Sequence, residues 1–417
     1  MTTPDPKNLA VVGAGIVGVC CALQLLRDGH RVTLIDRAGP GEGTSFGNAS
    51  VIEPHGIIPV PTPGVLWQVP KYLMDPLGPL AIRWSYLPRL APWLARFVWN
   101  SRPAQVKRNM AALDAILKPT IESYRDLIKW AGAEDMLREQ GWLAVAESPG
   151  AWKNTLAGVE IYKTFGVPLT VLKPEEVRQY EPAFQAKVEG AVFYPKVAHV
   201  INNFRFVQVL AGAAHRLGAV LARDEEVDFE LGEGGRVAAV RSREKRYPCD
   251  GVVIAGGAWS KALTAKLGYH PPLDTERGYH ITVPKPGFEL RLPVLSADRG
   301  FVATPLEIGM RVAGTDELGG LKLPPNWERA EIIRRNVRRW FPQLNDEGYT
   351  RWMGFRPSMP DSVPVIGPVP KVPNAWLAFG HGHLGLTMGA RTGQLIADQI
   401  AGRASDIDLA PYRAGRF

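Results

Sequence analysis

Cysteine is scarce in this chain: there are three in 417 residues, Cys20, Cys21 and Cys249. So few thiols exclude a fold built on disulfides and favour a reducing compartment. No Cys or His residues stand at the spacing of a zinc site, so no metal is expected. Motifs of nucleic-acid-binding modules, with aromatic side chains among basic ones, are also missing, and this argues against a nucleic-acid partner.

Charge is absent from Leu9 to Leu26. This run reaches only the lower limit of length for a membrane span. Three glycines at turn spacing interrupt it and no basic cluster precedes it, which argues against both a span and a signal peptide. We expect Cys20 and Cys21 to be small core residues of a helix rather than redox groups, and the chain to be cytoplasmic.

Acidic residues are nearly missing from residues 54–113, where Asp75 is the only one. Seven Lys or Arg residues fall in this segment, together with Trp67, Trp84, Trp93 and Trp99. One hypothesis is a surface that meets a quinone or lies on the inner face of the cytoplasmic membrane, because tryptophan and arginine suit the headgroup zone. The other is a lid over a substrate cavity, with its aromatic side chains in the core. The formal net charge of +8 favours anionic partners.

What is present is a composition typical of a folded protein, with 46% hydrophobic and 22% charged residues. The strongest motif is Gly13-Ala14-Gly15-Ile16-Val17-Gly18, which follows a short apolar strand at residues 9–12. Gly13 allows a tight turn, Gly15 lets the backbone approach a pyrophosphate, and Gly18 lets a helix pack on a strand. The helix over residues 19–28 then ends at Gly29.

A second strand at residues 31–35 ends at Asp36, whose carboxylate is placed to accept hydrogen bonds from an adenosine ribose. The amides at the helix N-terminus suit the diphosphate. Strand, glycines, helix, strand and acid in this order predict a bound FAD or NAD(P).

Periodicity predicts the remaining elements. Helices are expected at residues 80–99 with breaks at Pro88 and Pro92, and at 111–130, 152–165, 204–217, 328–340 and 387–401. Strands are expected at residues 141–146, 219–222, 227–231, 237–243, 252–255, 279–283, 301–305 and 311–314.

These elements predict an α/β fold in which a Rossmann-like nucleotide-binding domain is interleaved with an α+β substrate domain on a mostly antiparallel sheet. The first domain is expected to comprise residues 1–55, 196–265 and 350–417, and the second residues 56–195 and 266–349. Such interleaving predicts a cleft between them, where a substrate meets a cofactor.

Several segments further along the chain resemble one family. They are Asp250 to Ser260, with Gly256-Gly257-Ala258-Trp259; Gly354-Phe355-Arg356-Pro357; Pro364-Val365-Ile366-Gly367; and Gly380-His381-Gly382-His383-Leu384-Gly385-Leu386-Thr387. Together they are similar to the D-amino-acid oxidase superfamily of FAD-dependent oxidoreductases. The run Thr44-Ser45-Phe46-Gly47-Asn48-Ala49 looks most like the branch of bacterial D-amino-acid dehydrogenases.

The resemblance implies FAD, and the absence of an early His or Arg of the kind that sarcosine oxidases use for attachment predicts that it is non-covalent. The residues expected to bind it are Gly13, Gly15, Ile16, Val17, Gly18, Asp36, Arg37, Thr44, Ser45, Asn48, Ala49, Val227, Gly256, Gly257, Trp259, Gly382, His383, Gly385, Leu386 and Thr387.

The resemblance also implies a substrate site. Arg356 is expected to clamp the α-carboxylate of an amino acid, since a guanidinium offers two parallel donors; the alternative is a buried salt bridge. Phe301 and Arg299 lie on expected pocket segments. Tyr279 and His280 cannot both face the pocket, because side chains alternate along a strand, and Tyr279 is favoured.

The histidines of the same region are less clearly assigned. The backbone carbonyl near His383 is expected to accept from the substrate amine, while its side chain either lines the pocket or faces solvent. His381 is expected to be structural, and His55 a loop residue.

The implied activity is oxidative deamination of a D-amino acid, or of a cyclic imino acid such as a D-proline derivative, in amino-acid catabolism. A hydride passes from the α-carbon to flavin N5, and the electrons go on to a quinone or a protein partner. The alternatives are a glycine or sarcosine type of amine oxidase, a flavin-binding subunit of an electron-transfer complex and, more remotely, an NAD-dependent dehydrogenase. The side-chain preference, the acceptor and the oligomeric state stay open.

Overall fold

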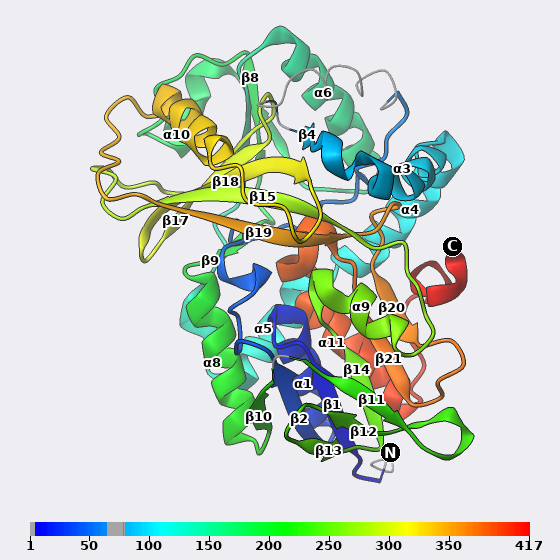
Figure 1. Cartoon of the computed structure of the whole chain (residues 1–417). Helices are drawn as coiled ribbons and strands as arrows, with labels where there is room; N and C mark the ends of the chain where they lie inside the picture. The colour runs from blue at the N-terminus through cyan, green and yellow to red at the C-terminus, as the bar shows by residue number, and fades with distance from the viewer. Residues whose placement is uncertain (1–4, 65–77, 79, 225) are drawn as a thin grey trace.

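Two large sheets organise the molecule. The computed structural model describes residues 5–64, 78, 80–224 and 226–417, and Figure 1 shows the sheets in separate halves of it, the larger one above. The fold is thus a Rossmann-like half interleaved with a half built on a mostly antiparallel sheet. Trp67 lies outside the described residues.

The lower sheet has six strands in the order β10-β2-β1-β14-β21-β20. The first five run parallel, whereas β20 is antiparallel to β21. Their bounds are β1 Asn8–Val12, β2 Arg31–Asp36, β10 Val220–Arg223, β14 Gly251–Ile254, β20 Val365–Pro368 and β21 Ala375–Phe379. Because a parallel sheet is covered on both faces, its central strands are continuous apolar runs. These continuous apolar runs allowed β1, β2 and β14 to be predicted from the sequence.

Helix α1 (Ile16–Arg27) follows β1 and is almost entirely buried. It begins three residues earlier than predicted and ends before Gly29, whose φ of +84° permits the turn. The prediction that Cys20 and Cys21 are core residues is confirmed, since both are buried and free. Within the part of the chain that the structure describes, none of the helices is both long and apolar enough to cross a membrane.

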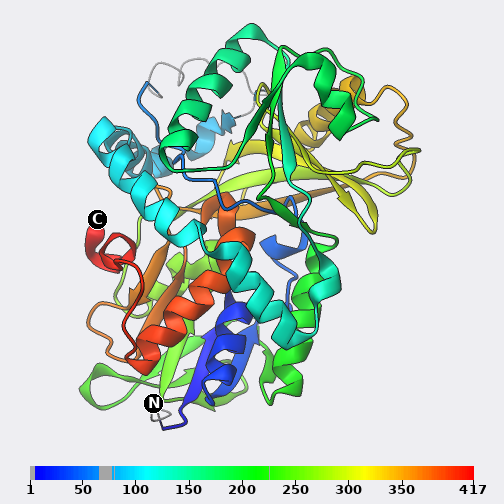
Figure 2. The ribbon, with the colours of Figure 1, turned by 180° about the vertical axis from the view of Figure 1, so that it is seen from behind.

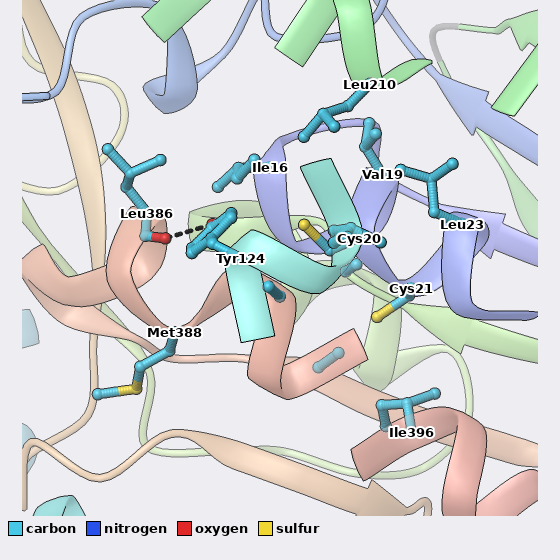
Figure 3. Close-up of a cluster of buried hydrophobic side chains, with 14 of the residues drawn as sticks. Ile16, Val19, Cys20, Cys21, Leu23, Tyr124, Leu210, Leu386, Met388 and Ile396 are labelled. Carbon is cyan, nitrogen blue, oxygen red and sulfur yellow. Dashed lines mark hydrogen bonds between the residues drawn. The ribbon is translucent and has the colours of Figure 1, made fainter. Parts of the chain in front are cut away.

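Four further helices pack with α1 on the same side of this sheet or at its edge (Figure 2). They are α4 (Pro103–Leu117), α5 (Thr120–Ala131), α8 (Asn203–Arg216) and α11 (Gly385–Ala401). Figure 3 shows the cluster they bury, in which the hydroxyl of Tyr124 donates to the carbonyl of Leu386. Tyr124 thereby ties α5 to the start of α11.

Two of the predicted helices were wrong. One is broken by a proline, and the other begins with residues that form a strand. The helix expected over residues 111–130 is two helices, because the chain breaks at Pro119 between α4 and α5. The helix expected over residues 80–99 is strand β4 (Leu80–Ile82) followed by helix α3 (Leu87–Asn100). Pro88 stands in the first turn of α3, where it leaves no amide unpaired, and so does not break the helix.

The upper sheet has nine strands in the order β19-β15-β18-β17-β16-β6-β8-β7, with β4 paired to β18. All pairings are antiparallel except β16 with β6 and β18 with β4. Helix α10 (Glu328–Trp340) packs on one face. The strands are β6 Trp142–Ala146, β7 Thr170–Leu172, β8 Gly190–Tyr194, β15 Asp274–Val283, β16 Val294–Ser296, β17 Phe301–Leu306, β18 Gly309–Leu318 and β19 Thr350–Ser358.

The smaller elements complete the fold. Two three-stranded sheets are formed by β11-β12-β13 and by β3-β9-β5. Their strands are β3 Val51–Ile52, β5 Leu137–Arg138, β9 Ala198–Val200, β11 Asp228–Leu231, β12 Val237–Arg241 and β13 Arg246–Pro248. The remaining α-helices are α6 (Pro149–Thr164), α7 (Val177–Tyr180) and α9 (Ser260–Ala265).

The predicted domain boundaries stay a prediction, and two placements differ from them. Strand β19 belongs to the upper sheet although residues 350–417 were assigned to the nucleotide-binding domain. Helices α4 and α5 belong to the core of the lower half although residues 56–195 were assigned to the substrate domain. In both places the chain crosses between the halves within an assigned segment.

The contact of α1 with α11 generates a prediction. A Cβ at Gly393 of α11 would lie 2.7 Å from the carbonyl oxygen of Cys20, so the helices must separate to admit it. We expect Gly393→Ala to lower the free energy of unfolding by about 1–3 kcal/mol, measured by urea denaturation. The control is Gly212→Ala in α8, whose Cβ would meet only the flexible end of Arg216 at 3.6 Å. The control should gain stability from helix propensity, and an equal gain at Gly393 would contradict the prediction.

Candidate active site

A cavity of about 1200 Å³ takes its walls from both large sheets. From the lower half it is bordered by the carboxyl ends of β1 and β2 and by the start of α11, and from the upper half by β15, β17, β18 and β19. Ligands of doubly wound folds bind at this edge of the parallel sheet.

The three motif glycines have separate roles at the lower end. Gly13 has φ +108°, and a Cβ there would lie 2.4 Å from the carbonyl oxygen of Ala255. At Gly18 a Cβ would lie 1.8 Å from the carbonyl oxygen of Gly13, so this glycine serves the packing of α1 and does not border the cavity. Gly15 does border it, beside the hydroxyl of Ser45.

Asp36 and its neighbours shape the wall beside the glycines. The carboxylate of Asp36 accepts from the amides of Ala14 at 2.8 Å and Ala38 at 2.9 Å, and so holds the turn and the loop after β2. Ser45 accepts from the amide of Ile16 at 2.9 Å, which satisfies one unpaired donor of the helix N-terminus. The guanidinium of Arg37 lies over the Trp259 ring, 3.7 Å from its centroid.

All the residues predicted to bind the cofactor border this cavity except Gly18. Besides those above they are Val17, Thr44, Asn48, Ala49, Val227, Gly256, Gly257, Gly382, His383, Gly385, Leu386 and Thr387. These residues fit a dinucleotide, because the wall beside the first helix is bare backbone at Gly13 and Gly15. A side chain at Gly256 would likewise collide with Leu263, at 2.8 Å.

Arg356 lies at the upper end of the cavity, on β19. Its guanidinium passes over Gly278 of β15, where a Cβ would be 2.5 Å from Nη2. It pairs with Asp316 of β18, and Nη1 also donates to the carbonyl of Thr315 at 3.3 Å. The salt bridge, which the sequence left as the alternative, is present, and the carboxylate clamp stays a prediction.

Tyr279 and Phe301 border the cavity, but their rings point into the core beneath α10. The Tyr279 hydroxyl donates to Glu317 at 2.7 Å and accepts from the amide of Asn326 at 2.9 Å. The Phe301 ring lies 4.5 Å from that of Trp340. Neither side chain presents a free group to a substrate, so their expected catalytic roles are corrected to roles in the wall.

His280 and Arg299 lie elsewhere. As alternation requires, His280 points to the other face of β15 from Tyr279; its Nδ1 lies 2.7 Å from the carbonyl oxygen of Gly47, and its ring stacks on Trp352. Arg299 is outside the cavity wall and pairs with Glu147 at 2.5 Å.

Burial lowers the pKa of all three histidines considered for the site. His383 borders the cavity, and burial together with the charge of Arg356 lowers its pKa to about 4. His381 lies 3.0 Å through Nε2 from the hydroxyl of Thr392, and burial lowers its pKa to about 3, which suits the structural role expected of it. His55 is a buried loop residue outside the wall, with its pKa lowered to about 4.

Six acids of the cavity wall were missed: Glu42, Glu53, Asp224, Glu226, Glu276 and Asp316. Glu276 lies directly opposite Arg356 in the register of β15 and β19. The sequence reasoning pointed away from it, because Tyr279 was expected to face the pocket and alternation puts Glu276, three residues earlier, on the opposite face of the strand. The sequence did not predict that β15 pairs with β19.

Helix α3 also contributes to the wall. Trp93, Leu94 and Phe97 border the cavity from one side of the helix, whereas Trp84 and Trp99 are 64% and 56% exposed. The inner part of the acid-poor segment therefore covers the cavity, as the lid hypothesis expects, and the outer part presents tryptophan to the surface.

The comparisons with known proteins agree with this geometry. The family model described as FAD dependent oxidoreductase (DAO) matches residues 8–399. The chain belongs to this family. It is 40% identical to a D-amino-acid oxidase of Bradyrhizobium diazoefficiens, over 99% of this chain and 100% of that protein. It is 31% identical to a D-amino acid dehydrogenase of the same organism, over 98% and 99%.

Among solved structures, a glycine oxidase from Geobacillus kaustophilus superposes with a TM-score of 0.75 at 21% identity, covering 99% of both chains. The likeness at this identity concerns the fold. The family establishes that the chain is an oxidoreductase with FAD as its cofactor. The expectation that FAD is held without a covalent bond stays a prediction.

The buried His280 generates a pH prediction. Burial lowers its pKa to about 3, so the unfolded state takes up a proton first as the pH falls through 6.5. The stabilisation from this histidine is therefore present above pH 6.5 and lost below it. We expect the difference in unfolding free energy between wild type and His280→Gln to shrink by about 2 kcal/mol from pH 7 to pH 5. The exposed His270→Gln is the control, and a difference independent of pH at His280 would contradict the prediction.

Proposed function

We propose that this protein catalyses the oxidative deamination of a D-amino acid, or of a cyclic D-imino acid such as a D-proline derivative. The observation that carries the proposal is Arg356, a guanidinium at the end of a cavity whose other end is built for a dinucleotide. The relatives named D-amino-acid oxidase and D-amino acid dehydrogenase support it over nearly the whole chain.

The side chains of the cavity have three tasks in this reaction. Arg356 holds the α-carboxylate with two parallel hydrogen bonds and thereby fixes the direction of the α-hydrogen. Trp93, Leu94 and Phe97 exclude water on the side of α3. Helix α11 begins at Gly385 and turns its partly positive end toward the cavity, where it stabilises negative charge. When bound, FAD accepts the hydride from the α-carbon.

The experiment that tests the proposal is an anaerobic titration of the yellow protein with D- and L-amino acids, prolines, glycine and sarcosine. Bleaching by D-amino acids, with an oxo acid and ammonia as products, supports it. Bleaching by sarcosine with formaldehyde as product would indicate amine oxidation, and no bleaching by any amino or imino acid would overturn the proposal.

Arg356→Lys tests the clamp. A lysine offers one point charge in place of two parallel donors, so one or two charge-assisted bonds of about 1.5–3 kcal/mol are lost. We expect kcat/KM for D-amino acids to fall on the order of a hundredfold. Arg351→Lys on the same strand, whose side chain is exposed and pairs with Glu331, is the control and should keep the wild-type value. Near-normal kinetics of Arg356→Lys would remove the assignment.

We further propose that the electrons pass to a quinone at the membrane surface. Trp84 and Trp99 are exposed, and the exposed side chains of Arg89, Arg96 and Arg102 belong to the same segment. Tryptophan and arginine together suit an anionic headgroup layer.

Flotation with anionic liposomes tests this surface. We expect the wild type to float and the double variant Trp84→Ser, Trp99→Ser to bind about tenfold more weakly, because two interfacial side chains are removed. Trp130→Ser on α5, also at an exposed tryptophan, is the control and should float as the wild type does. Failure of the wild type to float would contradict the membrane proposal and leave the chemistry of the cavity untouched.

A further inference from the structure

The upper end of the cavity carries more acid than one substrate clamp requires. Glu276 and Asp316 face it, against the single cation Arg356 among the described residues of that end. Asp316 is paired with Arg356 and its side chain is 40% exposed. Glu276 is half-buried like Asp316, and its face of β15 borders the cavity.

The position of Glu276 relative to Arg356 is fixed by the sheet. The two residues are direct partners in the antiparallel pair β15 and β19, so their side chains leave the same face with Cβ atoms about 5 Å apart. The guanidinium leans over Gly278, the next residue on that face of β15. A carboxylate held by Arg356 therefore has the carboxyl group of Glu276 beside it.

An amino acid carries its ammonium one carbon away from its carboxylate. If Arg356 holds the carboxylate, the ammonium lies within reach of a group next to Arg356. We propose that Glu276 binds the substrate ammonium and accepts a proton from it, which makes it a further catalytic residue. This inference rests on the proposed function.

The step balances without a further reactant. One N–H bond of the ammonium breaks, its proton forms an O–H bond with a carboxylate oxygen of Glu276, and the electron pair stays on nitrogen. The neutral amine then has the lone pair that forms the C=N bond as the hydride leaves the α-carbon. A protonated amine has no such pair, so the step lets the enzyme use the zwitterion that prevails near neutral pH.

The groups around Glu276 suit this role. Burial raises the pKa of Glu276, and the charge of Arg356 and the Ser358 hydroxyl oppose that shift, so the carboxylate is a stronger base than one in water. Asp274, two residues earlier on the same face, adds like charge and itself accepts from the Tyr86 hydroxyl at 3.0 Å.

The remaining titratable neighbours are weaker candidates. His381 and His383 approach from the other side, and their lowered pKa values of about 3 and about 4 make them weaker bases than Glu276. Asp316 on β18 is occupied by the guanidinium.

Glu276→Gln keeps the shape of the side chain and removes the proton acceptor. We expect kcat/KM for a D-amino acid at pH 7 to fall on the order of a hundredfold. The loss should shrink as the pH rises toward the pKa of the free amine, because the neutral amine is then supplied by the solution. Glu276→Asp should keep part of the activity at pH 7. Asp274→Asn removes the like charge two residues away, so it should keep kcat/KM at pH 7 close to the wild type while the pH profile moves to lower pH.

A binding measurement separates this role from mere support of Arg356. 2-Aminoisobutyrate has no α-hydrogen and is not oxidised, and isobutyrate is the same molecule without the amine. We expect Glu276→Gln to bind isobutyrate as tightly as the wild type or more tightly, and 2-aminoisobutyrate at least tenfold more weakly at pH 7. A support role would weaken both ligands equally.

Equal weakening of both ligands, or an unchanged pH profile in Glu276→Gln with its flavin bound, would overturn the inference. Either result leaves the proposed function standing as long as the wild type is bleached by D-amino acids. If the wild type is not bleached, the proposed function itself fails.

Discussion

The contact on which the structure depends is the one between backbones at the first turn. The carbonyl of Gly13 lies against Gly18 of α1, and Gly13 itself lies against the carbonyl of Ala255 at the end of β14. No side chain fits at either glycine, so strand β1, helix α1 and strand β14 are held at a distance that only glycine permits. This closeness places the start of α1 and the ends of β1, β2 and β14 around one end of the cavity. A similarly close backbone contact occurs where Gly393 of α11 packs against α1.

Most of the lower half could be predicted from the sequence, because its signals are local. A buried parallel strand, a glycine turn and a fully buried helix each depend on a pattern of consecutive residues. The predicted bounds of β1, α1, β2 and β14 therefore agree with the structure to within a few residues. Strands β20 and β21 were not, since short apolar runs between prolines carry no periodicity to distinguish them. The break at Pro119 was overlooked because the apolar spacing continues across it, although the residue before a proline is biased away from the helical region.

The site divides in the same way. Its lower wall follows from motifs, and the residues predicted to bind the cofactor border the cavity except Gly18. Its upper wall depends on which strands pair, and sequence spacing does not disclose pairing. Tyr279 was expected to face the substrate pocket, but its hydroxyl donates a hydrogen bond to Glu317 on the neighbouring strand. Glu276 was overlooked because its partner Arg356 lies 80 positions away in the sequence, on β19.

The charges at the upper end give a reason for the composition of residues 54–113. Helix α3 from this segment borders the same cavity as Glu276 and Asp316, the two acids beside Arg356. An acid on its inner side would add like charge in a place where burial already disfavours the ionised carboxyl of Glu276 and raises its pKa. The inner side is accordingly apolar, with Trp93, Leu94 and Phe97, and the basic residues stand on the outer side. The lid hypothesis thus accounts for the lack of acids on the inner side, and the membrane contact of the outer side stays a proposal.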